Sequence, residues 1–137
     1  MFKINKMTQY SVSILSSLEE GAVLSVPDIA IKTLIPVPTV AKLSKTLQKK
    51  GFMTSVRGAG GGYTLSRPLA KVSVAQIIEA LEGPITIASC IESSNSCSLS
   101  QSCSRRLNWL KVNQVLNDAL SQLSLAEMSG SQRCKDV

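Results

Sequence analysis

Apolar residues recur along the first part of the chain at spacings that predict short helices and one hairpin. A first helix is expected over 7–20 with a stop at Gly21, because its apolar residues fall three or four apart. These residues are Tyr10, Ile14, Leu15 and Leu18. The spacing places them on one face of an amphipathic helix.

Two further helices are predicted by their start and stop signals. Ser25 followed three residues later by Asp28 is typical of a capping box, and it predicts a short second helix that breaks over 34–36. A third helix is expected to begin near Pro38, since the first helical position needs no N–H donor, and to end at Gly51.

The third helix has two unlike faces. At 100° per residue, one face is apolar or small and is expected to pack; it consists of Val40, Leu43, Ser44 and Leu47. The opposite face is mostly cationic and consists of Pro38, Ala41, Lys42, Lys45 and Lys49. One side should therefore join a core while the other meets solvent or a charged partner.

A glycine-dense segment follows, and then a fourth helix. Strands are expected over 52–56 and 63–65, on either side of a tip at 58–62 that carries four glycines and can approach another surface closely. Ser73 with Gln76 predicts another capping box, opening a helix that stops at Gly83. Its apolar stripe is Val74, Ile77, Ile78 and Leu81.

The order of elements predicts a mainly α fold with a small β wing. We expect a winged helix-turn-helix DNA-binding domain over 1–83, a cysteine-bearing loop over 84–104, a long dimerisation helix over 105–128 and a disordered tail over 129–137. The long helix has the apolar spacing of a heptad seam, which favours pairing with a second copy of the chain. The seam residues are Trp109, Val112, Leu116, Ala119 and Leu123.

The positive charge lies in one stretch of the chain. The net charge is +6, yet Ile29 to Ile78 carries eight basic and no acidic residues, leaving 7 basic against 9 acidic residues elsewhere. Such a concentrated patch indicates a polyanionic partner, double-stranded DNA, although a solvated basic face is the alternative. Phosphate contacts are expected from Lys42, Lys45, Lys49 and Lys50, base contacts from Thr39 and Arg57, and further contacts from Pro38 and Tyr63.

Composition narrows the function classes. A chain of 137 residues suits one domain with an appendage, and the absence of histidine removes the usual general base and the commonest metal ligand. No apolar run is long enough for a membrane span, so a cytoplasmic protein without membrane partner or small-molecule substrate is expected. We expect no enzymatic activity. A thiol redox enzyme would need a resolving cysteine and a substrate cleft that the sequence does not indicate.

Three cysteines lie in the serine-rich loop. Six residues separate Cys90 from Cys97, and five separate Cys97 from Cys103. Thiolates spaced so loosely can converge on one soft metal centre, whereas the tight pairs of zinc ribbons are absent. Redox-active or incidental cysteines are the alternative reading.

The wing sequence, residues 55–65 with Arg57 and its glycines, resembles the signature of the Rrf-two family of winged-helix regulators, as does the opening Lys6 to Tyr10. The resemblance extends over nearly the whole chain. It implies a homodimeric transcription regulator, expected to be a repressor, with an iron-sulfur cluster (2Fe-2S or 4Fe-4S) on Cys90, Cys97 and Cys103. It further implies that the cluster reports iron-sulfur status, iron, redox state or nitric oxide and alters operator affinity.

The chain departs from that family at three positions. Several members carry a glutamate where this chain has Ala41, some use a histidine ligand where it has Arg106, and others an aspartate where it has Gln9. The fourth ligand stays open between Glu92, Cys134, a side chain of a second subunit such as Gln9, and a small molecule. A zinc-dependent regulator using Cys134, a thiol-redox regulator and a winged-helix protein-interaction module are the alternatives.

Overall fold

The computed structural model describes residues 3–18, 21–92 and 103–129. It is mainly helical with one two-stranded antiparallel sheet, which confirms the expected fold class. The elements in chain order are α1 (Lys6–Ser17), α2 (Val26–Thr33), α3 (Val37–Lys49), β1 (Met53–Val56), β2 (Gly62–Leu65), a 3-10 turn η1 (Leu69–Lys71), α4 (Val74–Glu82), α5 (Arg105–Gln122) and α6 (Leu125–Ser129). None of the described helices could span a membrane.

The first helix is shorter than expected. Asn5 caps it by accepting a hydrogen bond from the N–H of Met7, and the helix ends at Ser17 instead of continuing toward Gly21. Leu18 adopts an extended backbone and is fully buried. The free energy gained by burying the Leu18 side chain in the core is therefore larger than that of extending α1 by one more turn.

The helix-turn-helix forms as predicted. Ser25 caps α2 by accepting from the N–H of Asp28, and α2 ends at Leu34, whose φ of 60° lies in the left-handed region. In α3, all four residues of the predicted packing face are buried, namely Val40, Leu43, Ser44 and Leu47. Gly51 follows α3 with a φ of 84° and frees the chain to turn into β1.

The wing is a hairpin in which Met53 pairs with Leu65 and Val56 pairs with Gly62. A third strand-like contact joins it to the head, because Leu24 and Tyr63 exchange two backbone hydrogen bonds of 3.0 and 2.8 Å. A Cβ on Gly62 would lie 2.1 Å from the carbonyl oxygen of Leu24, so only glycine permits this approach. The start of β2, the end of this strand nearer the wing tip, is thus fixed to the segment before α2.

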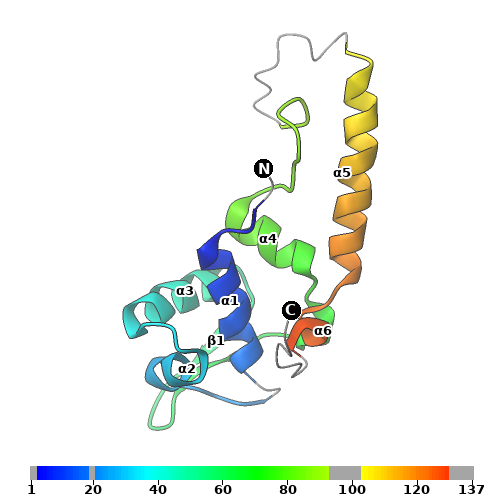
Figure 1. Cartoon of the computed structure of the whole chain (residues 1–137). Helices are drawn as coiled ribbons and strands as arrows, with labels where there is room; N and C mark the ends of the chain where they lie inside the picture. The colour runs from blue at the N-terminus through cyan, green and yellow to red at the C-terminus, as the bar shows by residue number, and fades with distance from the viewer. Residues whose placement is uncertain (1–2, 19–20, 93–102, 130–137) are drawn as a thin grey trace, which may run out of the picture.

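The expected long helix over 105–128 is in fact two helices. α5 ends at Gln122, Leu123 is extended, and α6 begins at Leu125. The break lets the chain return to the head, where the N–H of Val74 donates to Leu123 across 2.9 Å and the N–H of Leu125 donates to Val72 across 2.8 Å. Figure 1 shows α5 running alongside α4 and rising past it toward residues 88–92.

The hydrophobic core includes residues beyond the expected boundary of the head. It gathers α1 to α4 around residues such as Ile14, Leu47 and Ile77, and it also includes Ile85 and Leu125. Both are buried, Leu125 completely. The division of the chain at residue 83 stays a prediction, but the described core is continuous across it.

Candidate DNA-binding face and cysteine site

The outer face of α3 is cationic in the folded chain. Lys42, Lys45 and Lys49 are exposed, opposite the buried face, and Lys50 continues them at the C-cap. Lysines on one exposed face can each reach a phosphate independently, because their long side chains need no common geometry. The structure therefore brings these four predicted residues together.

Two other basic residues of the stretch are occupied within the head. Lys32 donates to the backbone carbonyl of Ser17 across 3.2 Å, and the Arg67 guanidinium lies 5.3 Å from the ring centre of Phe52. Of the eight basic residues of the stretch, five lie on α3, its C-cap and the wing, and Lys71 is exposed on η1. The largest group of basic side chains is therefore on α3 and the wing.

The wing presents Arg57 to solvent at its tip, beside Gly58 and Gly60, which have positive φ. The predicted DNA-contact residues Thr39 and Tyr63 are less exposed to solvent. Thr39 is half-buried in the first turn of α3, and Tyr63 packs against the core. Arg57 is thus the wing side chain best exposed to a nucleic acid, and Tyr63 supports the wing from within.

The start of α5 connects two of the predicted cysteines. The backbone N–H of Arg106 donates to the carbonyl of Cys103 across 3.2 Å, and its Nε donates to the carbonyl of Cys90 across 3.2 Å. Both cysteines are free thiols and half-buried. Cys97 and Cys134 lie outside the described residues. Arg106 thus fixes the chain on both sides of the cysteine loop.

The candidate fourth ligands do not gather around this site within the described residues. Glu92 is exposed, and the Gln9 side chain donates to the carbonyl of Ile4 across 3.0 Å. In residues 3–18, 21–92 and 103–129 no three His, Cys, Asp or Glu side chains are grouped closely enough to hold a metal ion. The ligand set therefore stays a prediction.

A buried asparagine that the sequence reading missed holds the segment leading to Cys90. Asn113 Nδ2 donates to the carbonyl of Ile85 across 3.0 Å, and its Oδ1 accepts from the N–H of Ile87 across 3.1 Å. Asn117 adds a longer contact to Ile85 at 3.4 Å. A polar residue inside a helix usually indicates solvent, so no sequence signal marked this role.

Only some residues of the predicted heptad seam are exposed to solvent. Leu116 packs against the core, whereas Trp109 is 48% exposed and Val112 and Leu123 are similarly open. Two unpredicted apolar residues of α5 are even more exposed, Leu107 at 66% and Val115 at 68%. One face of α5 therefore serves its own head, and an apolar surface remains uncovered.

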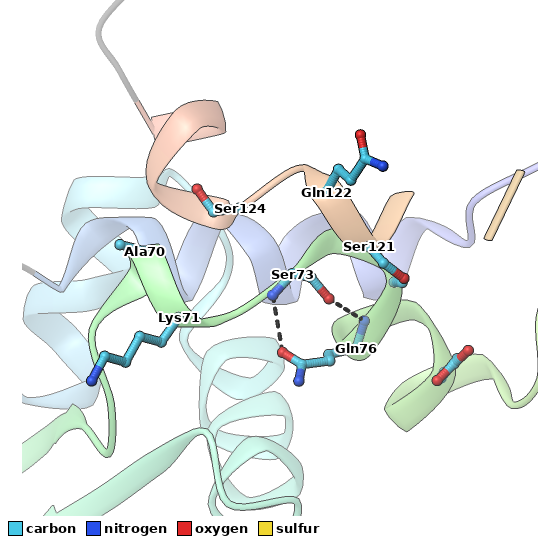
Figure 2. Close-up of a pocket in the computed structure, with 9 residues that line it drawn as sticks. Ala70, Lys71, Ser73, Gln76, Ser121, Gln122 and Ser124 are labelled. Atoms are coloured by element: carbon cyan, nitrogen blue, oxygen red, sulfur yellow. Dashed lines mark hydrogen bonds between the residues drawn. The ribbon is translucent and has the colours of Figure 1, made fainter. Parts of the chain in front are cut away.

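A polar cavity of about 370 Å³ lies where the end of α5 returns to the head. Figure 2 shows Ser73 and Gln76 hydrogen-bonded to each other in this cavity, with Lys71 on one side, Ser121 on the other and Ser124 above them. These two hydrogen bonds form the predicted capping box of α4. The polar groups here stabilise the helix start at the junction of head and α5.

The winged helix-turn-helix and its cationic recognition helix define a DNA-binding regulator of transcription. The family model described as "Iron-dependent Transcriptional regulator", Rrf2, matches residues 4–131. The chain therefore belongs to the Rrf2 family.

Its relatives are likewise regulators. The HTH-type transcriptional regulator IscR of Xenorhabdus nematophila is 29% identical over 119 residues, covering 87% of this chain and 71% of IscR. CymR of B. subtilis, described as its global cysteine regulator, is 25% identical with a TM-score of 0.75, covering 97% and 100% of the two chains. The oxidised form of Staphylococcus aureus CymR is 28% identical with a TM-score of 0.67, covering 94% and 97%.

Proposed function

We propose that this chain is a transcriptional regulator whose operator affinity is controlled by an iron-sulfur cluster bound to Cys90, Cys97 and Cys103. The observation that carries the proposal is the double contact of Arg106 with the backbone at Cys90 and Cys103. It connects the two ends of the cysteine loop at the start of α5. The match to a family model described as an iron-dependent transcriptional regulator supports an iron-bearing centre.

The donor set suits such a cluster. Two of the three thiols are free and half-buried, and sulfur ligands match soft iron-sulfur centres. Arg105 and Arg106 open α5 directly after Cys103 and Ser104, so basic side chains stand at the helix start beside the proposed ligands. When bound, the cluster supplies an iron centre that responds to oxygen, nitric oxide or iron supply.

Residues of α5 would transmit a change at the loop to the DNA-binding head. Arg106 holds Cys90 at one end of α5, Asn113 holds residues 85–87 along its length, and Leu123 is hydrogen-bonded to Val74 at the other end. Any reordering of the loop therefore shifts the position of α5 relative to α4. In a dimer, that shift changes the spacing of the two recognition helices, which must fit successive major-groove faces.

We further propose that the uncovered apolar surface of α5 pairs with the same surface of a second copy. Trp109, Val112 and Val115 are exposed and fall within about 120° of one another around an 18-residue helix. A stripe of large apolar side chains on one helix face usually marks an interface. Val115→Asp should convert a dimer into a monomer in light scattering. Val23→Asp, an exposed valine outside α5, should leave the dimer intact.

The cluster is tested by anaerobic purification with metal and sulfide analysis. We expect a brown protein with iron and sulfide, and a colourless one after Cys97→Ser. Ser104→Ala is the matched control beside Cys103, because this hydroxyl makes no capping hydrogen bond. Duplex binding should then differ between loaded and iron-free protein. A colourless wild-type protein with one zinc ion would refute the proposal and favour the zinc-dependent alternative that uses Cys134.

A thiol switch without a cluster is the second candidate. Two free thiols flank Arg106, and a CymR relative has been solved in an oxidised form. In that case an iron-free protein would change its operator affinity on mild oxidation, and reductant would reverse the change. Oxidation that leaves the affinity of the iron-free protein constant would exclude this candidate.

A further inference from the structure

The tip of the recognition helix is apolar where a base-reading surface usually carries hydrogen-bonding side chains. Pro36, the N-cap of α3, and Pro38 are exposed, Val37 is 47% exposed, and Ala41 one turn later is half-buried. Thr39 supplies the one side-chain hydroxyl of this turn, and it is half-buried. The first turn of α3 thus offers little hydrogen-bonding capacity to a base edge.

This apolar tip, defined by Pro36, Val37, Pro38 and Ala41, is continuous with the cationic face. Pro38 lies on the same side of α3 as Lys42, Lys45 and Lys49, opposite the buried residues. In helix-turn-helix proteins the N-terminal residues of the second helix meet the base edges in the major groove. Lysines that bind phosphates on this face would bring the tip against those edges.

We propose that the apolar tip recognises thymine by contact with its C5-methyl group in the major groove. The inference rests on the proposed DNA-binding face, and it identifies the base chemistry that this face selects. Thymine is the base that presents a methyl group there, and apolar side chains are its usual partners. The partner is therefore a duplex with thymines at the positions under the N-terminus of α3.

Two prolines make the contact efficient. Pro36 has a φ of −56°, and the ring of each proline restricts φ at a helix start where no N–H donor is needed, so the tip is fixed before binding. A fixed apolar surface loses little conformational entropy when it contacts a methyl group. Burial of one methyl is worth about a fourfold change in affinity, which is enough to discriminate thymine from cytosine or uracil.

The experiment compares a duplex selected from a random library by this protein with the same duplex carrying deoxyuridine at each selected thymine. Deoxyuridine keeps the base pair and removes only the methyl group. We expect about a fourfold loss of affinity for each contacted methyl. In Val37→Ala and Pro38→Ser the loss should shrink, whereas Val23→Ala, an exposed valine outside α3, should retain it.

The outcomes separate this inference from the proposed function. Equal affinity for the thymine and deoxyuridine duplexes, with salt-dependent binding intact, overturns methyl recognition and leaves DNA binding standing. A loss of unchanged size in both α3 variants, with unfolding transitions like that of the wild type, also overturns it. Absence of binding to any duplex overturns both.

Discussion

Asn113 donates its side-chain amide to the backbone carbonyl of Ile85 across 3.0 Å, within the described core. The same side chain accepts from Ile87, so it satisfies two backbone groups of the segment that leads to Cys90. Nothing else in α5 fixes this segment by two hydrogen bonds within the described residues. Asn113 therefore fixes the position of residues 85–87, which lead to the cysteine loop, along α5.

Replacing Asn113 by alanine should destabilise the protein by about 2 kcal/mol. It removes the partner of the Ile87 N–H and leaves the Ile85 carbonyl only the longer contact with Asn117 at 3.4 Å. Urea unfolding followed by circular dichroism measures the change. Asn108→Ala, at an exposed position of the same helix, should stay within about 0.5 kcal/mol of the wild type. Alanine is the better helix former, so propensity acts against the expected loss. An Asn113→Ala variant as stable as Asn108→Ala would therefore mean that the two hydrogen bonds contribute little.

Lys45 is exposed on the cationic face of α3 and should neutralise one phosphate. Lys45→Ala should weaken binding to all duplexes alike and lower the slope of log affinity against log salt by about 0.9 for the lost contact. Fluorescence anisotropy across a salt series measures this slope. Lys111→Ala removes an exposed lysine of α5 and should not alter it. A loss confined to one sequence would instead assign Lys45 to base recognition.

Leu34 is a strained residue on the surface. Its φ of 60° lies in the left-handed region, and its side chain is 90% exposed, so it gains little from burial. Leu34→Gly should stabilise the protein by about 0.5–1 kcal/mol, since relief of the backbone exceeds the added entropy of glycine. Leu34→Val should act in the opposite direction in the same thermal unfolding measurement, because a β-branched residue tolerates this conformation less.

Ser44 is fully buried in α3, and its hydroxyl has no hydrogen-bond partner among the residues that the structure describes. Ser44→Ala should raise the free energy of unfolding by about 1 kcal/mol, because it removes an unsatisfied polar group and improves helix propensity. The matched variant is Ser11→Ala, which removes a buried hydroxyl that donates to Met7 across 2.9 Å. Chemical denaturation should show no gain there. Destabilisation by Ser44→Ala would indicate a hydrogen bond to bound water.

The sequence predicted α3 well because its apolar residues recur with the period of an α-helix. Val40, Leu43 and Leu47 repeat at helical spacing, so one face had to pack and the lysines had to face outward. It failed at the end of α5 because the apolar stripe runs through Leu123, although Ser124 and Glu127 have the spacing of a capping box and form one at the start of α6. The helix breaks there because Leu125 is buried in the core of the head, a long-range contact that local periodicity does not contain.

The sequence predicted which residue types form the candidate site. It predicted less well which residues hold them in place. Cysteine spacing and the basic stretch indicated the chemistry, since few residue types bind soft metals or phosphates. The role of Arg106 was not visible, because a hydrogen bond to the Cys90 carbonyl depends on how the loop returns to α5. Tyr63 illustrates the converse, since a wing residue expected at DNA packs inward against the core.

Leu125 is buried against the head, which is built mainly from residues before Gly83. This contact limits how the DNA-binding part of such a regulator can be separated from the rest, in engineering or in evolution. A DNA reader cut out after α4 would leave a water-exposed hole where the last helix docks, so it should misfold or aggregate when fused to a foreign sensor. Reader and sensor would then have to be exchanged as one piece.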